Sequence, residues 1–413
     1  MTRKTLPVAV MLFGLGAGAA QAADLFDLTV NVTTPQTQSG SASFTSITNL
    51  INALQSQSLN NLVSSYTQTS AATATLNIRG MPATVSYPAN STALTLTVPS
   101  AGVNVTFNGT TRDDSQNQLK NFLLKNGSSL LTSILQSLVA NSPIDPIAGN
   151  PNSLQNSSAH NDFAIGTGIG IASSEVPRAG TAMVSEPFLM TAGGDIGFAS
   201  SGGITSTIVN LPFRFVIPLP DPRFAVTLDV PITYINTQGA STFMGSFGAA
   251  LRVPVLDNWY LTPNVRFGAG GSIDLGAGAL QYSGGLASRY DIYWNDLDIT
   301  IGNGITIAKT APLSIGSISV SYNLTNELFN NGAQVEGSLP YTIFGQPTSW
   351  QAYLIDTAVT GSKVYINHYD EIGVNVGTRT LMNTQNWDTL RVGAALTAGS
   401  RYTAFKLAFS ARF

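Results

Sequence analysis

The sequence predicts a mainly β protein whose C-terminal part is an antiparallel transmembrane β-barrel of about 12 strands, or alternatively about 14. A small N-terminal α+β region precedes the barrel. One observation is the alternation of apolar and polar side chains, which runs from about residue 162 to the end of the chain. Another is composition: 10% of the residues are charged, whereas soluble domains carry about 25%.

The first 22 residues have the pattern of a secretory signal peptide. Arg3 and Lys4 are followed by an apolar run over residues 6–19, and Ala20-Gln21-Ala22 forms a small-x-small cleavage site. The apolar run is shorter than the roughly 20 residues that a membrane-spanning helix needs. We therefore expect a secreted mature chain that begins near Ala23.

Residues 23–142 are expected to form the α+β region, lying in the periplasm or plugging the barrel. Apolar residues recur at helical spacing between Ile47 and Val63 and again after Ser115, while residues 76–107 alternate as strands do. The next segment, residues 143–161, is rich in Pro, Asn and Ser and is predicted to be a linker.

The barrel is expected to comprise residues 162–413, with its charged side chains on one face of the strands. A charge facing hydrocarbon costs about 2–4 kcal/mol at the bilayer midplane, so this face should line the lumen. The lumen-lining candidates are Arg214, Asp229, Arg252, Arg266, Asp298, Glu371, Arg379, Arg391, Lys406 and Arg412. Basic residues outnumber acidic ones in this set, which predicts a mild anion preference once the N-terminal region is removed.

Asp-containing turns over residues 220–222, 256–258 and 295–296 are expected at the same rim as the C-terminus. Trp259, Tyr260, Tyr293, Trp294 and Trp387 should form an aromatic girdle there. Residues 325–349 are too long for a short turn at this rim, which indicates a further strand pair near residues 335–344.

The last 13 residues, RYTAFKLAFSARF, form one alternating strand that ends on Phe413. This ending resembles that of Gram-negative outer-membrane β-barrel proteins, either porin-like or similar to autotransporter translocators. The resemblance implies an outer-membrane location and makes Phe413 part of the signal that the assembly machinery recognises. It also implies membrane lipid, that machinery and small solutes as partners.

The chain offers little material for catalysis or metal binding. It has no cysteine and only two histidines. The Gly-rich stretches at residues 166–170 and 268–271 lack the strand-then-helix context of a phosphate-binding loop. His368 lies near Lys363, Asp370 and Glu371, but outer-membrane phospholipases have a Ser where this chain has Asp370. We therefore expect no enzyme activity, cofactor or metal, and the net charge of −3 argues against a nucleic-acid partner.

The sequence thus favours a barrel channel or transporter-like protein for small solutes, plugged or gated by its N-terminal region. One alternative is an autotransporter-like translocator, with residues 23–115 as a short passenger and a helix over residues 115–141. Another is a structural or adhesive surface protein.

Overall fold

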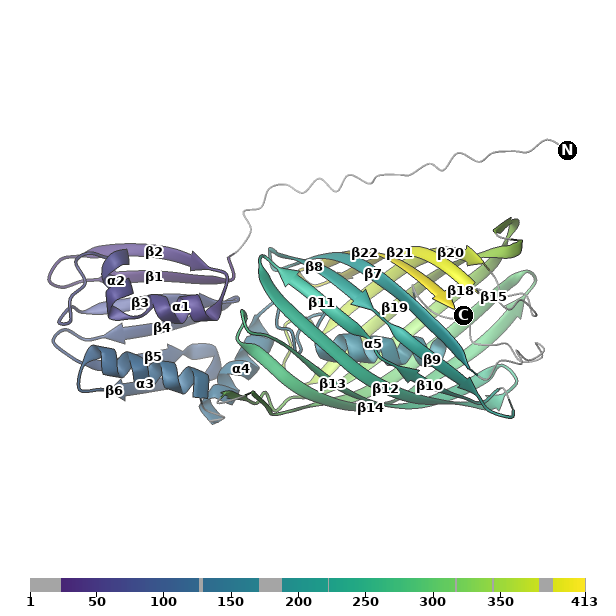
Figure 1. Ribbon diagram of the computed structural model, residues 1–413, viewed down its shortest axis with the longest axis horizontal. Helices are drawn as coiled ribbons and strands as arrows, with labels where there is room; N and C mark the ends of the chain where they lie inside the picture. Colours follow the sequence, from purple (N-terminus) through teal and green to yellow (C-terminus); the bar gives the residue numbers. More distant parts are fainter. Residues whose placement is uncertain are drawn as a thin grey trace, which may run out of the picture.

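The computed structural model describes residues 24–125, 129–170, 188–221, 223–315, 318–343, 345–378 and 389–412. Residues 1–22, where a signal peptide is expected, and Arg379, Trp387 and Phe413 lie outside these residues. The protein has two parts, an N-terminal α+β domain and a β-barrel, arranged end to end along one axis (Figure 1).

The N-terminal domain is a six-stranded antiparallel sheet in the order β2-β1-β3-β4-β5-β6. Helices cover one face, and alternate strand residues such as Val30, Ala74 and Val85 are buried beneath them. The strands are β1 (Phe26–Val32), β2 (Gln38–Phe44), β3 (Ala72–Ile78), β4 (Met81–Tyr87), β5 (Ala93–Val98) and β6 (Val103–Asn108). The helices are α1 (Ile47–Ala53), α2 (Ser56–Leu62), η1 (Pro99–Ala101), α3 (Arg112–Lys125) and α4 (Ser129–Asn141). The predicted small α+β region is confirmed, although β1 and β2 come before the first helix.

The barrel has 12 strands, as predicted, and closes where β22 pairs with β7. Two strands carry double labels because each is interrupted at a proline. The β8–β9 strand is interrupted at Pro212, and the β10–β11 strand is interrupted at Val230 and Pro231. Proline lacks the N–H that a strand ladder needs. The labelled segments are β7 (Leu189–Ser201), β8 (Ile204–Leu211), β9 (Phe213–Pro218), β10 (Ala225–Asp229), β11 (Ile232–Thr237), β12 (Ala240–Leu256), β13 (Trp259–Ser272), β14 (Ala277–Trp294), β15 (Leu297–Ala311), β18 (Thr325–Ile343), β19 (Gln346–Gly361), β20 (His368–Thr378), β21 (Thr389–Gly399) and β22 (Tyr402–Arg412).

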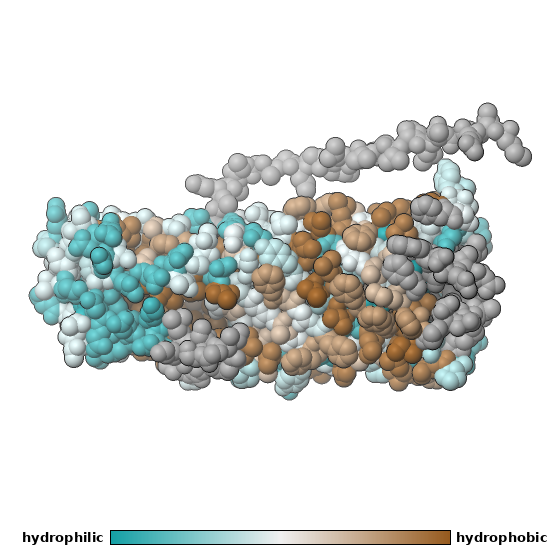
Figure 2. All heavy atoms as spheres, in the orientation of Figure 1, coloured by the Kyte–Doolittle hydropathy of each residue, from teal (hydrophilic) through white to brown (hydrophobic). Residues whose placement is uncertain are grey.

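The outer surface of the barrel is apolar. Val265 is 63% exposed and Phe409 is 56% exposed, whereas their strand neighbours Arg266 and Ser410 are buried. These outward side chains contribute to the hydrophobic surface that Figure 2 shows over the barrel, in contrast to the hydrophilic N-terminal domain. Among the described helices, none has the length and hydrophobicity needed to span a membrane.

The two rims of the barrel differ. The C-terminal end of β22 shares its rim with the turns at residues 219–224, 257–258 and 295–296, as the alternation of strand directions requires. Residues 325–349 belong to the long strands β18 and β19, whose turn lies at this same rim, so the expected strand pair is present. The other rim carries the longest loop, residues 312–324, with the small hairpin β16 (Leu313–Ile315) and β17 (Ile318–Val320).

The N-terminal domain docks on this second rim, opposite the C-terminal end of β22 (Figure 1). Its hydrophobic core continues into the barrel through Ile204, Leu275 and Leu324. A backbone hydrogen bond of 2.8 Å from Ile47 to Asp274 ties α1 to a rim turn. The two parts therefore share one core.

A buried polar contact reinforces this junction. Arg79 of the domain pairs with Asp145 at 3.2 Å, and neither side chain is exposed. Tyr322, from the rim loop, donates a hydrogen bond to the same carboxylate at 3.5 Å. Burial raises the pKa of the Tyr322 hydroxyl well above its usual value, which keeps it protonated as a donor.

Residues 143–161, expected to be an irregular linker, are more ordered than that. Residues 143–150 are buried between the domain and the rim. From Leu154 the chain forms helix α5 (Leu154–Thr167), so the expectation of uninterrupted barrel strands from about residue 162 is also corrected. The first barrel strand begins at Leu189.

Candidate functional site: a helix inside the barrel lumen

Helix α5 lies inside the barrel along its axis (Figure 1). It contacts the wall formed by β12, β13, β14, β15 and β18. The helix ends at Gly168, whose left-handed conformation (φ 73°) suits a residue without Cβ. The Gly-rich stretch that begins at Gly166 is thus the end of a luminal helix and not a phosphate-binding loop.

Glycines in the wall make room for the helix. A Cβ atom added to Gly302 would lie 2.7 Å from Thr167, and one added to Gly332 would lie 3.0 Å from Phe163. On the helix, a Cβ at Gly166 would overlap the Cβ of Ala287. Small side chains on both surfaces therefore allow α5 to pack closely against the strands.

An ion-pair network holds the middle of the helix to the wall. Arg266 on β13 lies 2.8 Å from Asp162 of α5 and 2.8 Å from Asp229 on β10. Arg214 on β9 lies 3.8 Å from Asp229. These side chains are all at least nine-tenths buried, so removing one partner would leave an uncompensated charge.

The opposite side of α5 faces a polar cavity of about 100 Å³. Its wall includes Asp195, Glu371 and Lys406, and the Lys406 ammonium lies 2.7 Å from the Glu371 carboxylate. Near the cavity, Tyr369 donates a hydrogen bond to Asn156 at 3.2 Å, and Asn152 donates one to Tyr402 at 2.8 Å. The helix is thus packed tightly on one side and bonded through polar groups on the other.

The lumen candidates from the sequence fall into three groups. Arg214, Asp229, Arg266, Glu371 and Lys406 belong to the networks around α5. Others lie farther from that helix or nearer the rims: Arg252, Asp298, Arg391 and Arg412. Arg379 lies outside the described residues.

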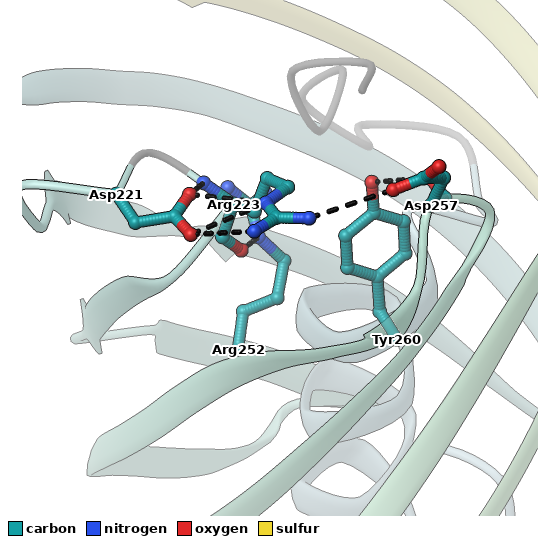
Figure 3. Close-up of polar contacts among 5 residues, drawn as sticks. All are labelled: Asp221, Arg223, Arg252, Asp257 and Tyr260. Carbon is teal, nitrogen blue, oxygen red and sulfur yellow. Dashed lines mark hydrogen bonds and ion pairs between the residues drawn. The ribbon is translucent and has the colours of Figure 1, made fainter. Parts of the chain in front are cut away.

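Arg252 belongs to a cluster at the C-terminal rim (Figure 3). Its Nε donates to the carbonyl oxygen of Arg223 at 2.9 Å, and its guanidinium lies over the Tyr260 ring at 5.8 Å. Arg223 in turn pairs with Asp221 at 2.8 Å and Asp257 at 3.5 Å, which joins two neighbouring turns. The hydrogen bond from Arg223 holds the pKa of Asp221 below its usual value.

Sequence reasoning missed several inward ionisable groups: Asp162, Asp195, Arg289, Asp291 and Glu336. Strand alternation alone could have found those on the barrel strands, because each has the opposite parity to outward apolar residues of its own strand, as Asp195 has to Ile196 and Phe198. Asp162 could not be found in this way, since it lies on a helix that the sequence did not reveal.

The ionisable cluster near His368 does not form one site. Glu371 points into the lumen, whereas His368 and Asp370 are exposed on the outer surface. His368 Nε2 lies 2.6 Å from Asp356 Oδ2. Ligand atoms of Asp356, His368 and Asp370 come within 4.8 Å of one another, which is the spacing of a possible cation site.

We expect Gly302→Leu to displace α5 from the wall, because the added side chain must occupy the position of Thr167 and Ile169. The expected result is a rise in ion conductance in planar bilayers, smaller than that of a barrel that also lacks residues 143–150, which still cover the domain rim in this variant. Gly284→Leu is the control, because its Cβ would lie 3.7 Å from the nearest atom. Equal conductance of the two variants would contradict the close packing.

A closed antiparallel barrel with an apolar outer surface and a polar interior is the architecture of outer-membrane β-barrel proteins. The protein is of this class, and an outer-membrane location follows from it. In structure comparisons, the β domain of the Bordetella autotransporter BrkA has a TM-score of 0.44 and 14% identity, covering 55% of this chain and 99% of its own.

The translocator domain of the autotransporter NalP from Neisseria meningitidis has a TM-score of 0.38 and 13% identity, covering 56% of this chain and 89% of its own. An outer membrane channel from Pseudomonas putida has a TM-score of 0.37 and 12% identity, covering 58% of this chain and 100% of its own. No protein-family model and no curated protein matches the sequence.

Proposed function

We propose that the barrel anchors the N-terminal domain on the outer surface of the cell, with the chain passing through the lumen as α5. This favours the translocator-like alternative over an open channel. The observation that carries the proposal is topological: the domain lies at one rim, and both ends of the barrel segment lie at the other (Figure 1).

The direction follows from how bacterial barrels are built. They have an even number of strands, so both ends of the barrel segment lie at one rim, and their periplasmic turns are short. Here both rims carry two-residue turns, such as 257–258 at the rim of the C-terminal strand and 238–239 at the domain rim, but the longest connection, residues 312–324, lies at the domain rim. With the C-terminal rim in the periplasm, the N-terminal domain is extracellular.

Cysteine labelling tests the orientation cleanly because the chain has no native cysteine. Thr75→Cys places a thiol at an exposed position of the domain, and Asp257→Cys places one at the C-terminal rim, where the Asp257 side chain is 90% exposed. On intact cells, a membrane-impermeant maleimide should label Thr75→Cys but not Asp257→Cys. After outer-membrane permeabilisation both should react. The reverse pattern on intact cells would refute the proposed orientation.

The same proposal assigns roles to the chain ends. Residues 1–22 act as the signal peptide for export, and Phe413 contributes the signal for the outer-membrane assembly machinery. Support for the second role comes from the sequence, in which Phe413 has the same parity as the exposed Leu407 and Phe409.

A second candidate function is a gated channel for small solutes. The observation that favours it is the polar cavity beside α5, lined by Asp195, Glu371 and Lys406. If α5 moved away from this cavity, a polar path through the barrel would open. Single-channel recording of the intact protein distinguishes the two, because the anchor hypothesis requires no solute flux.

A further inference from the structure

The N-terminal sheet has two open and uncharged edges. Its outermost strands are β2 and β6, with the sequences QSGSASF and VNVTFN. Within the described residues, the backbone of β2 pairs only with β1, and that of β6 only with β5. Proteins usually protect such edges with charged residues, proline or a covering element. The two strands contain neither charge nor proline.

Two rows of polar, uncharged side chains cross the helix-free face and end at both edges. Their members are direct cross-strand neighbours, and hydroxyl pairs such as Thr29–Ser41 and Thr95–Thr106 lie 3.0 Å apart. One row is Ser41, Thr29, Thr75, Thr84, Thr97 and Asn104; the other is Ser39, Asn31, Thr73, Ser86, Thr95 and Thr106. A neighbouring sheet placed at either edge would continue both rows.

Strand direction determines which edges fit together. Five successive antiparallel pairings make β2 and β6 run in opposite directions. Copies in one membrane share an orientation, so β2 beside the β6 of a neighbour is an antiparallel pair, whereas β2 beside β2 is parallel. The antiparallel ladder is the more stable per residue.

The position of the domain exposes these edges to neighbouring copies. Its strands run along the same long axis as the barrel, with β2 and β6 on opposite sides of the domain (Figure 1). When that axis stands across the membrane, both edges face sideways, and the domain and barrel have similar widths in this view. A second copy can therefore approach either edge.

We propose that the β2 edge of one copy pairs with the β6 edge of the next in the same membrane. The partner is a second copy of this chain, and the contact is heterologous, so it generates rows or rings of molecules. The inference does not depend on which side of the membrane the domain occupies, and maleimide labelling tests that orientation separately.

Disulfide cross-linking of the full chain in its membrane tests the pairing. The double variants Ser41→Cys/Asn104→Cys and Ser39→Cys/Thr106→Cys each place thiols at both ends of one row. After oxidation, a non-reducing gel should show dimers, trimers and higher species for at least one of them. Each single edge variant should remain monomeric, because one copy then lacks the facing thiol.

The control is Thr75→Cys, an exposed position in the same row on the central strand β3. Its cross-linking measures random collision in the membrane. A monomer pattern in both double variants, or cross-linking no greater than that of Thr75→Cys, would overturn the proposal. Dimers from Ser41→Cys alone would replace it with a two-fold β2–β2 contact. A difference in gel migration between the unheated and the boiled sample of each variant verifies that its barrel has formed.

Discussion

A barrel reduced to residues 188–413 is expected to conduct ions at least about tenfold better than the full chain, because barrels of eight strands are filled by side chains whereas 16-stranded ones hold open channels. In the full chain, α5 occupies the lumen and residues 143–150 close the domain rim. Conductance in planar bilayers is the measurement. An equally low conductance of the shortened barrel would mean that wall side chains alone close it.

The ion selectivity of this shortened barrel should be weak, which revises the mild anion preference expected from the sequence. The sequence count gave seven basic and three acidic inward residues. Without Arg379, and with the missed residues on the strands, the described set has seven basic ones (Arg214, Arg252, Arg266, Arg289, Arg391, Lys406 and Arg412) and six acidic ones (Asp195, Asp229, Asp291, Asp298, Glu336 and Glu371). A near-balanced lumen gives a reversal potential close to zero under a salt gradient.

The second large effect is expected from Arg266→Met. This substitution leaves the buried carboxylates of Asp162 and Asp229 without their shared partner at 2.8 Å. Breaking a buried ion pair from one side costs about 3–5 kcal/mol. When samples are heated to a series of temperatures before electrophoresis, we expect the band of the folded barrel to disappear at a lower temperature than for the unmodified protein. In planar bilayers we expect bursts of ion current as α5 detaches.

Arg223→Met is the matched control, since it removes an arginine whose side chain is 44% exposed at the rim. Exposed ion pairs contribute only about 0–1 kcal/mol. The double variant Asp162→Asn/Arg266→Met should recover part of the lost stability, because one uncompensated charge is gone. Similar stability of Arg266→Met and Arg223→Met would show that the network does not hold the helix.

The barrel was predictable because lipid and lumen impose opposite demands on alternate residues. Val265 beside Arg266, or Phe409 beside Ser410, marks a strand between two media without any other information. The six-stranded sheet was partly missed at β1 and β2. The Ser, Gly and Ala residues of β2 carry too little contrast between the two faces, whereas the alternating Phe26, Leu28 and Val30 of β1 could have been recognised.

Helix α5 was not predictable by the same reasoning. A helix on a soluble core has one apolar stripe, whereas α5, with the sequence LQNSSAHNDFAIGT, lies in a polar lumen and needs none. Its Asn and Ser residues are typical of turns when considered locally. The helix contacts strands more than 90 positions away in the chain, such as β13 with Arg266, and this tertiary setting decides its conformation.

The shared core of domain and rim limits how the chain can be assembled. The folded domain is about as wide as the whole barrel (Figure 1), whereas the lumen holds one helix and a cavity of about 100 Å³. If the domain is extracellular, as proposed, it cannot have crossed the lumen folded: either it threaded through as an extended chain, or the strands closed around the segment that becomes α5. Once folded against Ile204, Leu275 and Leu324, the domain is too wide to enter the lumen, so it prevents the helix from sliding toward the C-terminal rim.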